Sequence, residues 1–560
     1  MAEVISHNAT PELPPHYYRD NFLTLCNTVE AQYADLLSET ERQYLTTFRN
    51  LAFDSQCLYV RLISRTGPWF RESKLAYPEL GELTLAVDEL LATGMAEQAN
   101  ALSVDEMAGL FTVAELKSGF VEELQNTSSK NKPALMASIE ALGQRKIRRI
   151  QRKLETSRII APCGLLEVDV LQLLFFGNRG QNLTDFVLSD LGIARYFPYR
   201  LDRENRLFEN RVALEEYISC GNLSDVFYEL RETGETELLP ALAEQVLDLE
   251  VEYDSSRRRL YRLCNVLARD LERIDELDLA AELYALSKRH PARERRLRIA
   301  EHQQQWSEAK QLAGDILAAP WCEEERDAAN RILPRVLRKL GAKVPPRSRD
   351  NFQRIDIVVE RDELGVEQLA ALHLSCDWDQ VHYVENTLMN TLFGLAFWEQ
   401  IFHPIPGAFN NPFQSAPTDM YSTEFSSRRR DLISKRLRQL HRRGVAACLN
   451  EALDNYANYQ CRWVDWRRID ADLLNAVTRC IVDEHLLSIW ERILFDPGEN
   501  RRGFPDLLAL GKGPGDYCLI EVKGPGDALQ ESQKRWLRFF EKQGIPACVA
   551  WVQWREIDAD

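Results

Sequence analysis

The chain has 560 residues, of which 45% are hydrophobic, and this length predicts several globular domains with cores of their own. The formal net charge is −17, so a nucleic-acid-binding surface has to come from local basic patches rather than from the whole chain. The 12 cysteines include no CxxC pair, and we expect neither a secretory leader nor a membrane span, which needs about 18 apolar residues. These features predict a cytoplasmic protein with no membrane partner.

An N-terminal region with helical spacing is predicted over residues 17–221, after a flexible start over residues 1–16. Near its beginning, a segment rich in basic and aromatic side chains contains Arg61 and Arg65. This mixture suits contacts to backbone phosphates and stacked bases, so both arginines are candidate DNA contacts. The aromatic side chains also suit anchors of a helical core, which is the role we favour for them.

A SAP-like unit is predicted at about residues 105–160, where two helices flank an extended polar loop. Lys130 and Lys132 in this loop are expected to contact phosphates. The following helix carries a dense basic run that includes the candidate DNA contacts Arg145, Lys146, Arg148 and Arg149. Such a patch can bind DNA in an acidic protein, although a solvated helix face has the same composition.

The middle of the chain reads as two further helical units and a linker. Residues 164–218 combine a helix with extended segments, which favours a winged-helix-like unit. Residues 222–342 contain pairs of amphipathic helices typical of TPR-like repeats. The proline-containing segment 343–349 predicts a linker before a C-terminal α/β domain at residues 350–560. The predicted fold is therefore multidomain and mainly α.

A second basic run lies inside the C-terminal domain. It begins at Arg428 and Arg429, ends at Arg443, and contains Asp431 as its acidic residue. We expect Arg428 and Arg429 to contact DNA, with a solvated helix face as the alternative.

A stretch near the C-terminus carries the most specific chemistry. The apolar run 507–510, a glycine-rich turn and the strand-forming run 517–523 predict a β-hairpin, followed by a helix and a strand. Because side chains alternate along a strand, Glu521 and Lys523 should share one face, and the hairpin returns them beside Asp506. Two carboxylates and one ammonium group are expected to converge.

Such a cluster predicts a metal-dependent hydrolase. Close carboxylates repel each other unless a cation neutralises them, and oxygen ligands suit Mg²⁺ or Mn²⁺. A metal ion of this kind generates hydroxide and neutralises phosphate charge, while Lys523 orients the attacking water or stabilises the transition state. Asp506 and Glu521 are the expected ligands, and the predicted reaction is phosphodiester hydrolysis. The alternative is an exposed strand whose Glu-x-Lys pair neutralises itself.

The order strand, strand, helix, strand, with the motifs PD at 505–506, EVKGP at 521–525 and QKRW at 533–536, resembles the VRR-NUC domain of the PD-(D/E)xK nuclease superfamily. The resemblance implies that Gln533 supports the site, that the Val522 carbonyl is a further metal ligand, and that two ions are bound.

An upstream segment with Asp379, His382, Glu385 and the sequence TLFGL resembles the Fanconi-associated nuclease family, and this likeness covers nearly the whole chain from about Tyr17. The resemblance implies that Glu385 is both a catalytic residue and an acidic metal ligand. Family members usually have glycine after this glutamate, where this chain has Asn386. The chain is similar to bacterial-type members, since it has no counterpart of the ubiquitin-binding zinc finger of vertebrate relatives.

This second resemblance implies a structure-specific DNA nuclease that cuts near 5′ flaps, acts as a 5′ to 3′ exonuclease and takes part in interstrand crosslink repair. Its partner would be branched or flapped double-stranded DNA, bound by a monomer associated with the nucleoid. Arg501 and Arg502 are candidate DNA contacts beside the PD motif. Two alternatives remain open: a non-catalytic DNA-binding repair scaffold and a four-way junction resolvase.

Overall fold

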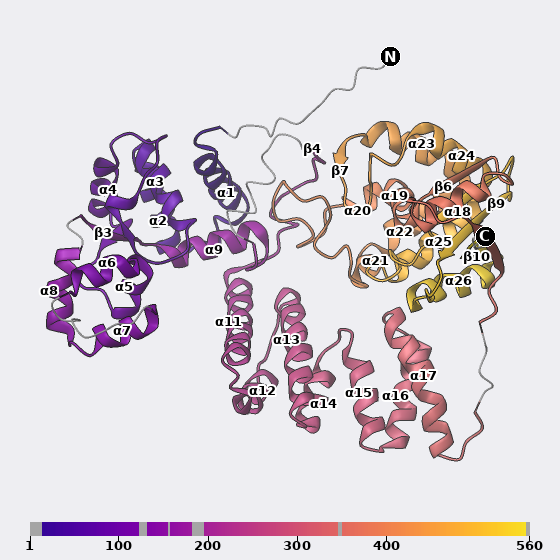
Figure 1. Ribbon diagram of the computed structural model, residues 1–560, viewed down its shortest axis with the longest axis horizontal. Helices are drawn as coiled ribbons and strands as arrows, with labels where there is room; N and C mark the ends of the chain where they lie inside the picture. The colour runs from indigo at the N-terminus through magenta and orange to yellow at the C-terminus, as the bar shows by residue number, and fades with distance from the viewer. Residues whose placement is uncertain (1–13, 122–130, 155–156, 182–194, 345–349, 556–560) are drawn as a thin grey trace, which may run out of the picture. The chain divides into compact units, whose positions relative to one another are not determined.

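The computed structural model describes residues 14–121, 131–154, 157–181, 195–344 and 350–555 (Figure 1). The chain divides into two compact units, Met1–Ala194 and Arg195–Asp560. The boundary expected at residue 221 falls inside one uninterrupted helix, α11 (Arg211–Thr233), and so is not a break between domains. Within the described residues, no helix is both long and apolar enough to cross a membrane.

The first unit combines helices with a small antiparallel sheet. Its sheet has the strand order β1-β3-β2, and helix α2 begins at a capping box formed by Ser38 and Glu41. The elements around this sheet are α1 (Tyr17–Tyr33), α2 (Glu39–Asn50), α3 (Phe53–Ile63), β1 (Phe70–Arg71), α4 (Leu83–Ala92), β2 (Ala96–Gln98), β3 (Ile159–Pro162) and α9 (Leu165–Phe176).

The SAP-like segment forms four short helices around a common core. These are α5 (Val104–Leu110), α6 (Val113–Gly119), α7 (Lys132–Glu140) and α8 (Gln144–Leu154). Phe111, Leu116, Phe120 and Ile139 are among the buried residues of this core. Helices α6 and α7 flank the predicted polar loop, and Lys130 in that loop lies outside the described residues.

The described part of residues 164–218 does not form the predicted winged-helix-like unit. Strand β4 (Arg195–Tyr196) pairs in parallel with β7 (Tyr459–Gln460), which lies in the C-terminal domain. The Tyr199 hydroxyl donates a hydrogen bond to the Asn411 carbonyl at 2.6 Å. The extended residues therefore belong to the second unit. Their pairing partner is distant in the sequence, so no local pattern predicts this arrangement.

The middle of the second unit is a series of packed helices, as the repeat pattern predicts. The helices are α11, α12 (Leu239–Leu247), α13 (Asp254–Arg273), α14 (Leu277–Leu286), α15 (Ala292–His302), α16 (Trp306–Ala318) and α17 (Glu323–Lys339). Sequential neighbours bury alanine and leucine side chains against each other in two adjoining cores. Each helix pair thus covers the apolar face of the next pair.

The C-terminal domain is built on a mixed sheet of five strands in the order β5-β10-β9-β8-β6. Strands β8 and β9 form the predicted hairpin, and the parallel strands β9 and β10 are joined through α26. The strands are β5 (Arg354–Val359), β6 (Gln380–Tyr383), β8 (Leu507–Leu510), β9 (Tyr517–Lys523) and β10 (Ala547–Trp554).

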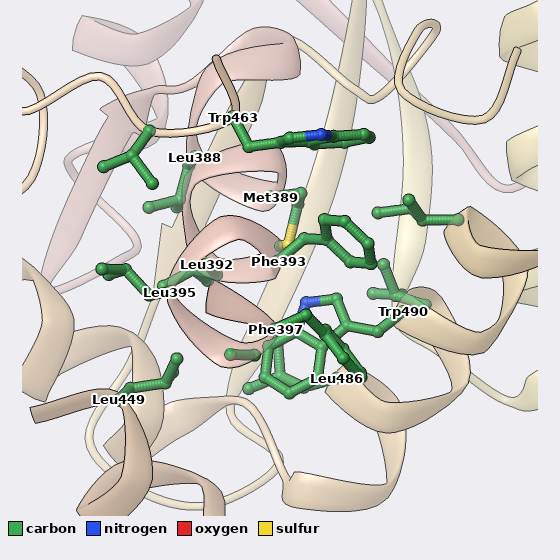
Figure 2. Close-up of a cluster of buried hydrophobic side chains, with 14 of the residues drawn as sticks. Leu388, Met389, Leu392, Phe393, Leu395, Phe397, Leu449, Trp463, Leu486 and Trp490 are labelled. Carbon is green, nitrogen blue, oxygen red and sulfur yellow. The ribbon is translucent and has the colours of Figure 1, made fainter. Parts of the chain in front are cut away.

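Helices cover both faces of this sheet. One face packs on α18 through Ala370 and Leu374. The other face shares a large core with the remaining helices, and α19 runs through the centre of that core between Trp463 and Trp490 (Figure 2). The helices are α18 (Val366–Leu374), α19 (Glu385–Ala396), α20 (Trp398–Ile401), α21 (Glu424–Arg428), α22 (Arg430–Arg443), α23 (Val445–Tyr456), α24 (Ala471–Cys480), α25 (Asp483–Phe495) and α26 (Glu531–Gln543).

Candidate active site

The hairpin places Glu521 and Lys523 on one face of the sheet, as strand alternation predicts. Ile520 and Val522 belong to the core under the opposite face. The Lys523 ammonium lies 2.8 Å from a Glu521 carboxylate oxygen, and both side chains are buried. The buried pair therefore differs from an exposed strand face whose charges are solvated.

Asp506 links this hairpin to helix α19. Its carboxylate accepts a hydrogen bond from the Val522 amide at 2.9 Å. Its main-chain carbonyl accepts hydrogen bonds from the amides of Val384 and Glu385 at 2.9 and 3.0 Å. These bonds bring Glu385 to the beginning of β8, so three carboxylates from distant parts of the chain meet at one edge of the sheet.

Glu385 is held by neighbours on both sides. The Tyr383 hydroxyl donates to one carboxylate oxygen at 3.0 Å, and the Asn386 amide donates to the other at 3.2 Å. Asn386 also accepts a hydrogen bond from the Phe504 amide at 3.2 Å, which joins it to the loop before Asp506. Glu385 itself has a φ of 39°, an unfavourable backbone conformation of the kind found at functional sites. Asn386 thus has a bonding role at the position where the family usually has glycine.

Glu521 is the most deeply buried acid of the cluster, with 1% of its surface exposed. Gln533 on α26 donates a hydrogen bond to one carboxylate oxygen, whereas the other oxygen has no hydrogen-bond partner among the described residues. Burial and the charge of Asp506 raise the pKa of Glu521 to about 7, even though Lys523 opposes this shift. Burial also raises the pKa of Asp506.

The donor set fits a divalent cation. Buried carboxylate oxygens normally have hydrogen-bond donors, and one of the Glu521 oxygens lacks one. Burial and mutual repulsion disfavour the ionised forms of Glu521 and Asp506, and a nearby cation relieves both effects. Oxygen ligands of this kind suit hard divalent ions rather than soft ones.

Glu367 is a further acid whose charge acts on Asp506, and the sequence analysis did not single it out. It lies in the first turn of α18, and its charge contributes, after burial, to the raised pKa of Asp506. A Cβ atom on Gly524, directly after β9, would lie 3.5 Å from the neighbouring Val366 side chain. The start of α18 therefore lies against the end of β9. An acid near a helix N-terminus is common, so the sequence held no signal for this placement.

The loop before Pro505 packs closely on α26. Gly503 has a φ of +80°, and a Cβ atom there would lie 2.8 Å from Ser532, so only glycine fits. The Arg501 carbonyl accepts a hydrogen bond from Asn390, and its guanidinium lies over the Tyr421 ring at 4.4 Å. The Arg502 side chain is exposed beside this loop.

The DNA candidates of the first unit differ in their surroundings. Arg61 pairs with Glu79 at 2.6 Å and lies over the Tyr18 ring at 3.9 Å, so its guanidinium serves the local fold. Arg65 is exposed, donates to the Tyr77 hydroxyl at 3.0 Å and lies over the Phe70 ring at 5.4 Å. The Lys132 ammonium donates to the Phe111 carbonyl at 3.0 Å.

Helix α8 presents a basic surface in the first unit. Its apolar side is buried through Ile147 and Ile150, and its basic side chains are exposed. The basic side chains are those of Arg145, Lys146, Arg148, Arg149, Arg152 and Lys153. None of them forms an ion pair with a carboxylate among the described residues. The predicted patch is therefore a row of exposed cations with no carboxylate partner in the part of the chain that the structure describes.

The prediction that Arg429 contacts DNA is wrong. Its side chain is buried, bonds the Asp419 carboxylate at 2.9 and 3.1 Å, and donates to the Gln400 carbonyl at 3.0 Å. Arg428 bonds the same carboxylate at 2.7 Å and donates to the Pro406 carbonyl, so its donors also serve the fold. Both arginines hold the loop before α21 in place, because a buried aspartate needs positive partners.

Fold and site together define a nuclease of the PD-(D/E)xK type. The family models described as "FAN1, HTH domain" and "VRR-NUC domain" match residues 16–97 and 442–554. The helix-turn-helix match thus falls on the start of the first unit, well before residues 164–218. Nuclease activity in this class depends on a divalent metal ion.

The chain belongs to the Fanconi-associated nuclease family. It is 34% identical to a Fanconi-associated nuclease 1 homolog of Pseudomonas aeruginosa, with 98% of each chain covered. It is 25% identical to Fanconi-associated nuclease 1 of Homo sapiens, with 96% of this chain and 62% of the human protein covered. A crystal structure of paFAN1 bound to 5′ flap DNA superimposes with a TM-score of 0.81 at 32% identity, over 98% of this chain and all of that chain.

Proposed function

We propose that this protein is a structure-specific DNA nuclease that hydrolyses phosphodiester bonds near 5′ flaps and acts as a 5′ to 3′ exonuclease. The observation that carries the proposal is the meeting of Glu385, Asp506 and Glu521 with Lys523 on one edge of the nuclease sheet. The 5′ flap is favoured because the paFAN1 structures that this chain resembles hold 5′ flap DNA.

The acids of the site are suited to hold Mg²⁺ or Mn²⁺, and we propose two ions. Glu385, Asp506 and Glu521 would supply carboxylate oxygens, and Val522 would supply its main-chain carbonyl. Bound there, the ions supply a hydroxide nucleophile and neutralise charge on the scissile phosphate.

The surrounding side chains prepare these acids for the reaction. Gln533 fixes the Glu521 carboxylate by a hydrogen bond, and Tyr383 and Asn386 fix that of Glu385. Lys523, held beside Glu521, is placed to orient the attacking water and to stabilise negative charge that develops on the phosphate. Little reorganisation is then needed when the substrate binds.

DNA contacts are proposed where cations are free. The exposed lysine and arginine side chains of α8 have no carboxylate partners among the described residues, and Arg65 and Arg502 are exposed as well. We also keep Lys132 and Arg501 as contacts, since a phosphate can exchange for their present weak partners. The protein would act as a cytoplasmic, nucleoid-associated monomer in the repair of interstrand crosslinks.

The test is cleavage of end-labelled 5′ flap, 3′ flap, four-way junction and linear duplex DNA with Mn²⁺. We expect cleavage near the junction of the 5′ flap and slower removal of nucleotides from 5′ ends. Equal cleavage of junctions and flaps by a dimer would instead establish a junction resolvase. Tight flap binding without cleavage at any metal concentration would establish a non-catalytic scaffold.

A further inference from the structure

Three side chains with metal-binding chemistry meet in the helical repeats, and none of them belongs to the carboxylate cluster of Glu385, Asp506 and Glu521. His290, Cys322 and Glu324 each offer one ligand atom, and these atoms lie within 4.8 Å of one another. Bonds of about 2.0–2.3 Å to Zn²⁺ would set tetrahedral ligand atoms roughly 3.3–3.8 Å apart. Small side-chain rotations therefore suffice to close the three residues around one ion.

The three residues come from two segments that are braced against each other. His290 lies in the turn between α14 and α15, Cys322 precedes α17, and Glu324 is in the first turn of α17. Next to them, the buried carboxylate of Glu325 pairs with Arg293, which also donates to the Ala319 carbonyl at 2.8 Å. This bracing fixes the backbone that carries the three side chains.

The cluster also has unused bonding capacity. The Nε2 atom of His290 lies 2.8 Å from the Glu324 carboxylate, and the Cys322 thiol lies within hydrogen-bonding reach of the same ring, although the buried Nδ1 atom has no well-aligned partner among the described residues. Cys322 is a free cysteine with 4% of its surface exposed. The imidazole therefore lies between the Glu324 carboxylate and the Cys322 thiol, and both are groups that bind a metal ion.

We propose that His290, Cys322 and Glu324 form a second metal site, selective for Zn²⁺ over the hard ions of the active site. A thiolate and an imidazole select borderline-soft ions, whereas the all-oxygen cluster around Asp506 selects Mg²⁺ or Mn²⁺. His290 and Glu324 also line a cavity of about 640 Å³, which leaves room for water as the fourth ligand.

The role of the site is to fix the junction between the repeats and the nuclease domain. The residue between two of the ligands, Glu323, is buried and pairs with Arg492 of α25 at 3.1 Å. Its main-chain amide donates to the Asp496 carboxylate at 3.2 Å. An ion that ties the start of α17 to the α14–α15 turn would therefore stabilise the docking of α17 on the nuclease domain.

The test is a Co²⁺ titration of the full-length chain after chelator treatment, in an Asp506→Ala background that disables the oxygen-ligand site. A thiolate bound to Co²⁺ gives near-ultraviolet charge-transfer absorbance, which oxygen ligands do not give. We expect this band to saturate at one equivalent and to disappear when Zn²⁺ displaces Co²⁺. Cys322→Ser should abolish the band, whereas Cys376→Ser, at an exposed cysteine, should leave it unchanged.

Absence of the band at stoichiometric Co²⁺, or its persistence in Cys322→Ser, would overturn the proposal. A second variant guards against misfolding of the first. Glu324→Gln changes a half-exposed carboxylate and should weaken Co²⁺ binding by at least about 10-fold. Unchanged affinity in this variant would also contradict the site. Zn²⁺ should raise the thermal unfolding temperature of the Asp506→Ala chain and not that of the chain that also carries Cys322→Ser.

Discussion

The nuclease site and the basic face of α8 arrange their charges in opposite ways. In the site, the side chains of Glu521 and Lys523 are buried, and the Lys523 ammonium lies 2.8 Å from a Glu521 carboxylate oxygen, so each charge neutralises the other. On α8, the basic side chains are exposed and pair with no described carboxylate. Removing one member of a buried ion pair leaves the other charge buried without a partner. Exposed charges instead contribute to DNA binding independently of each other, and salt screens them. A single substitution at the site should therefore nearly abolish cleavage, whereas each substitution on α8 should weaken DNA binding by a small step.

The largest effect is expected for Glu521→Gln. This change keeps the size of the side chain but removes the negative charge beside Lys523, and the cleavage rate should fall by at least about 10³-fold. Single-turnover cleavage of 5′ flap DNA measures it, and binding of the same DNA should persist. Glu541→Gln, an exposed acid on the same helix α26 as Gln533, is the matched control and should cleave normally. Cleavage by Glu521→Gln at a tenth of the wild-type rate would be too fast for the proposed role.

Arg429→Met separates a structural arginine from a DNA contact. The change leaves Asp419 buried without its main partner, so the free energy of unfolding should drop by about 3–5 kcal/mol. Urea denaturation measures this loss, and flap affinity of the folded chain should not change. Arg438→Met, at an exposed position of α22, should be neutral in stability. A fully stable Arg429→Met chain with weakened DNA binding would reverse the assignment.

The raised pKa of Glu521 predicts how metal affinity depends on pH. Its pKa of about 7 lies above the ordinary value of 4.5, so between these pH values the metal-free folded site holds a proton that a metal ion must displace. Affinity for Mn²⁺ should rise by about 10-fold per pH unit below pH 7 and level off above it. Calorimetric titration over this range measures the slope. Glu521→Gln should flatten it, and a flat profile in the unsubstituted chain would contradict the burial argument.

The smallest and most graded effect is expected on α8. A triple variant, with Gln in place of Arg145, Arg148 and Arg149, should lose three phosphate contacts. The magnitude of the negative slope of log affinity against log salt should therefore fall by about 3. Fluorescence anisotropy with flap DNA at several salt concentrations measures the slope. Arg335→Gln removes an exposed arginine that is already paired with Glu301 at 2.7 Å and should leave the slope unchanged. An unchanged slope in the triple variant would show that α8 is only a solvated face.

The sequence predicted the β8–β9 hairpin well because its determinants are local. Strand alternation, a glycine-rich turn and a helical repeat of apolar residues define β8, β9, α26 and β10. The pairing of β4 with β7 and the burial of Arg429 could not be predicted, since their partners are distant in the chain. Glu385 was predicted only through the family resemblance, and Glu367 was not predicted. An acidic residue at the start of a helix is common, so the local sequence does not indicate a function for it.

The most direct test of the account is the cleavage of end-labelled 5′ flap DNA by Asp506→Ala in the presence of Mn²⁺, with binding of the same DNA measured in parallel. The Asp506 carboxylate accepts a hydrogen bond from the Val522 amide, and its main-chain carbonyl holds the start of α19, so Asp506 connects the hairpin to the segment that carries Glu385. The account predicts that cleavage is abolished while flap binding is retained. Undiminished cleavage by this variant would contradict the assignment of the active site.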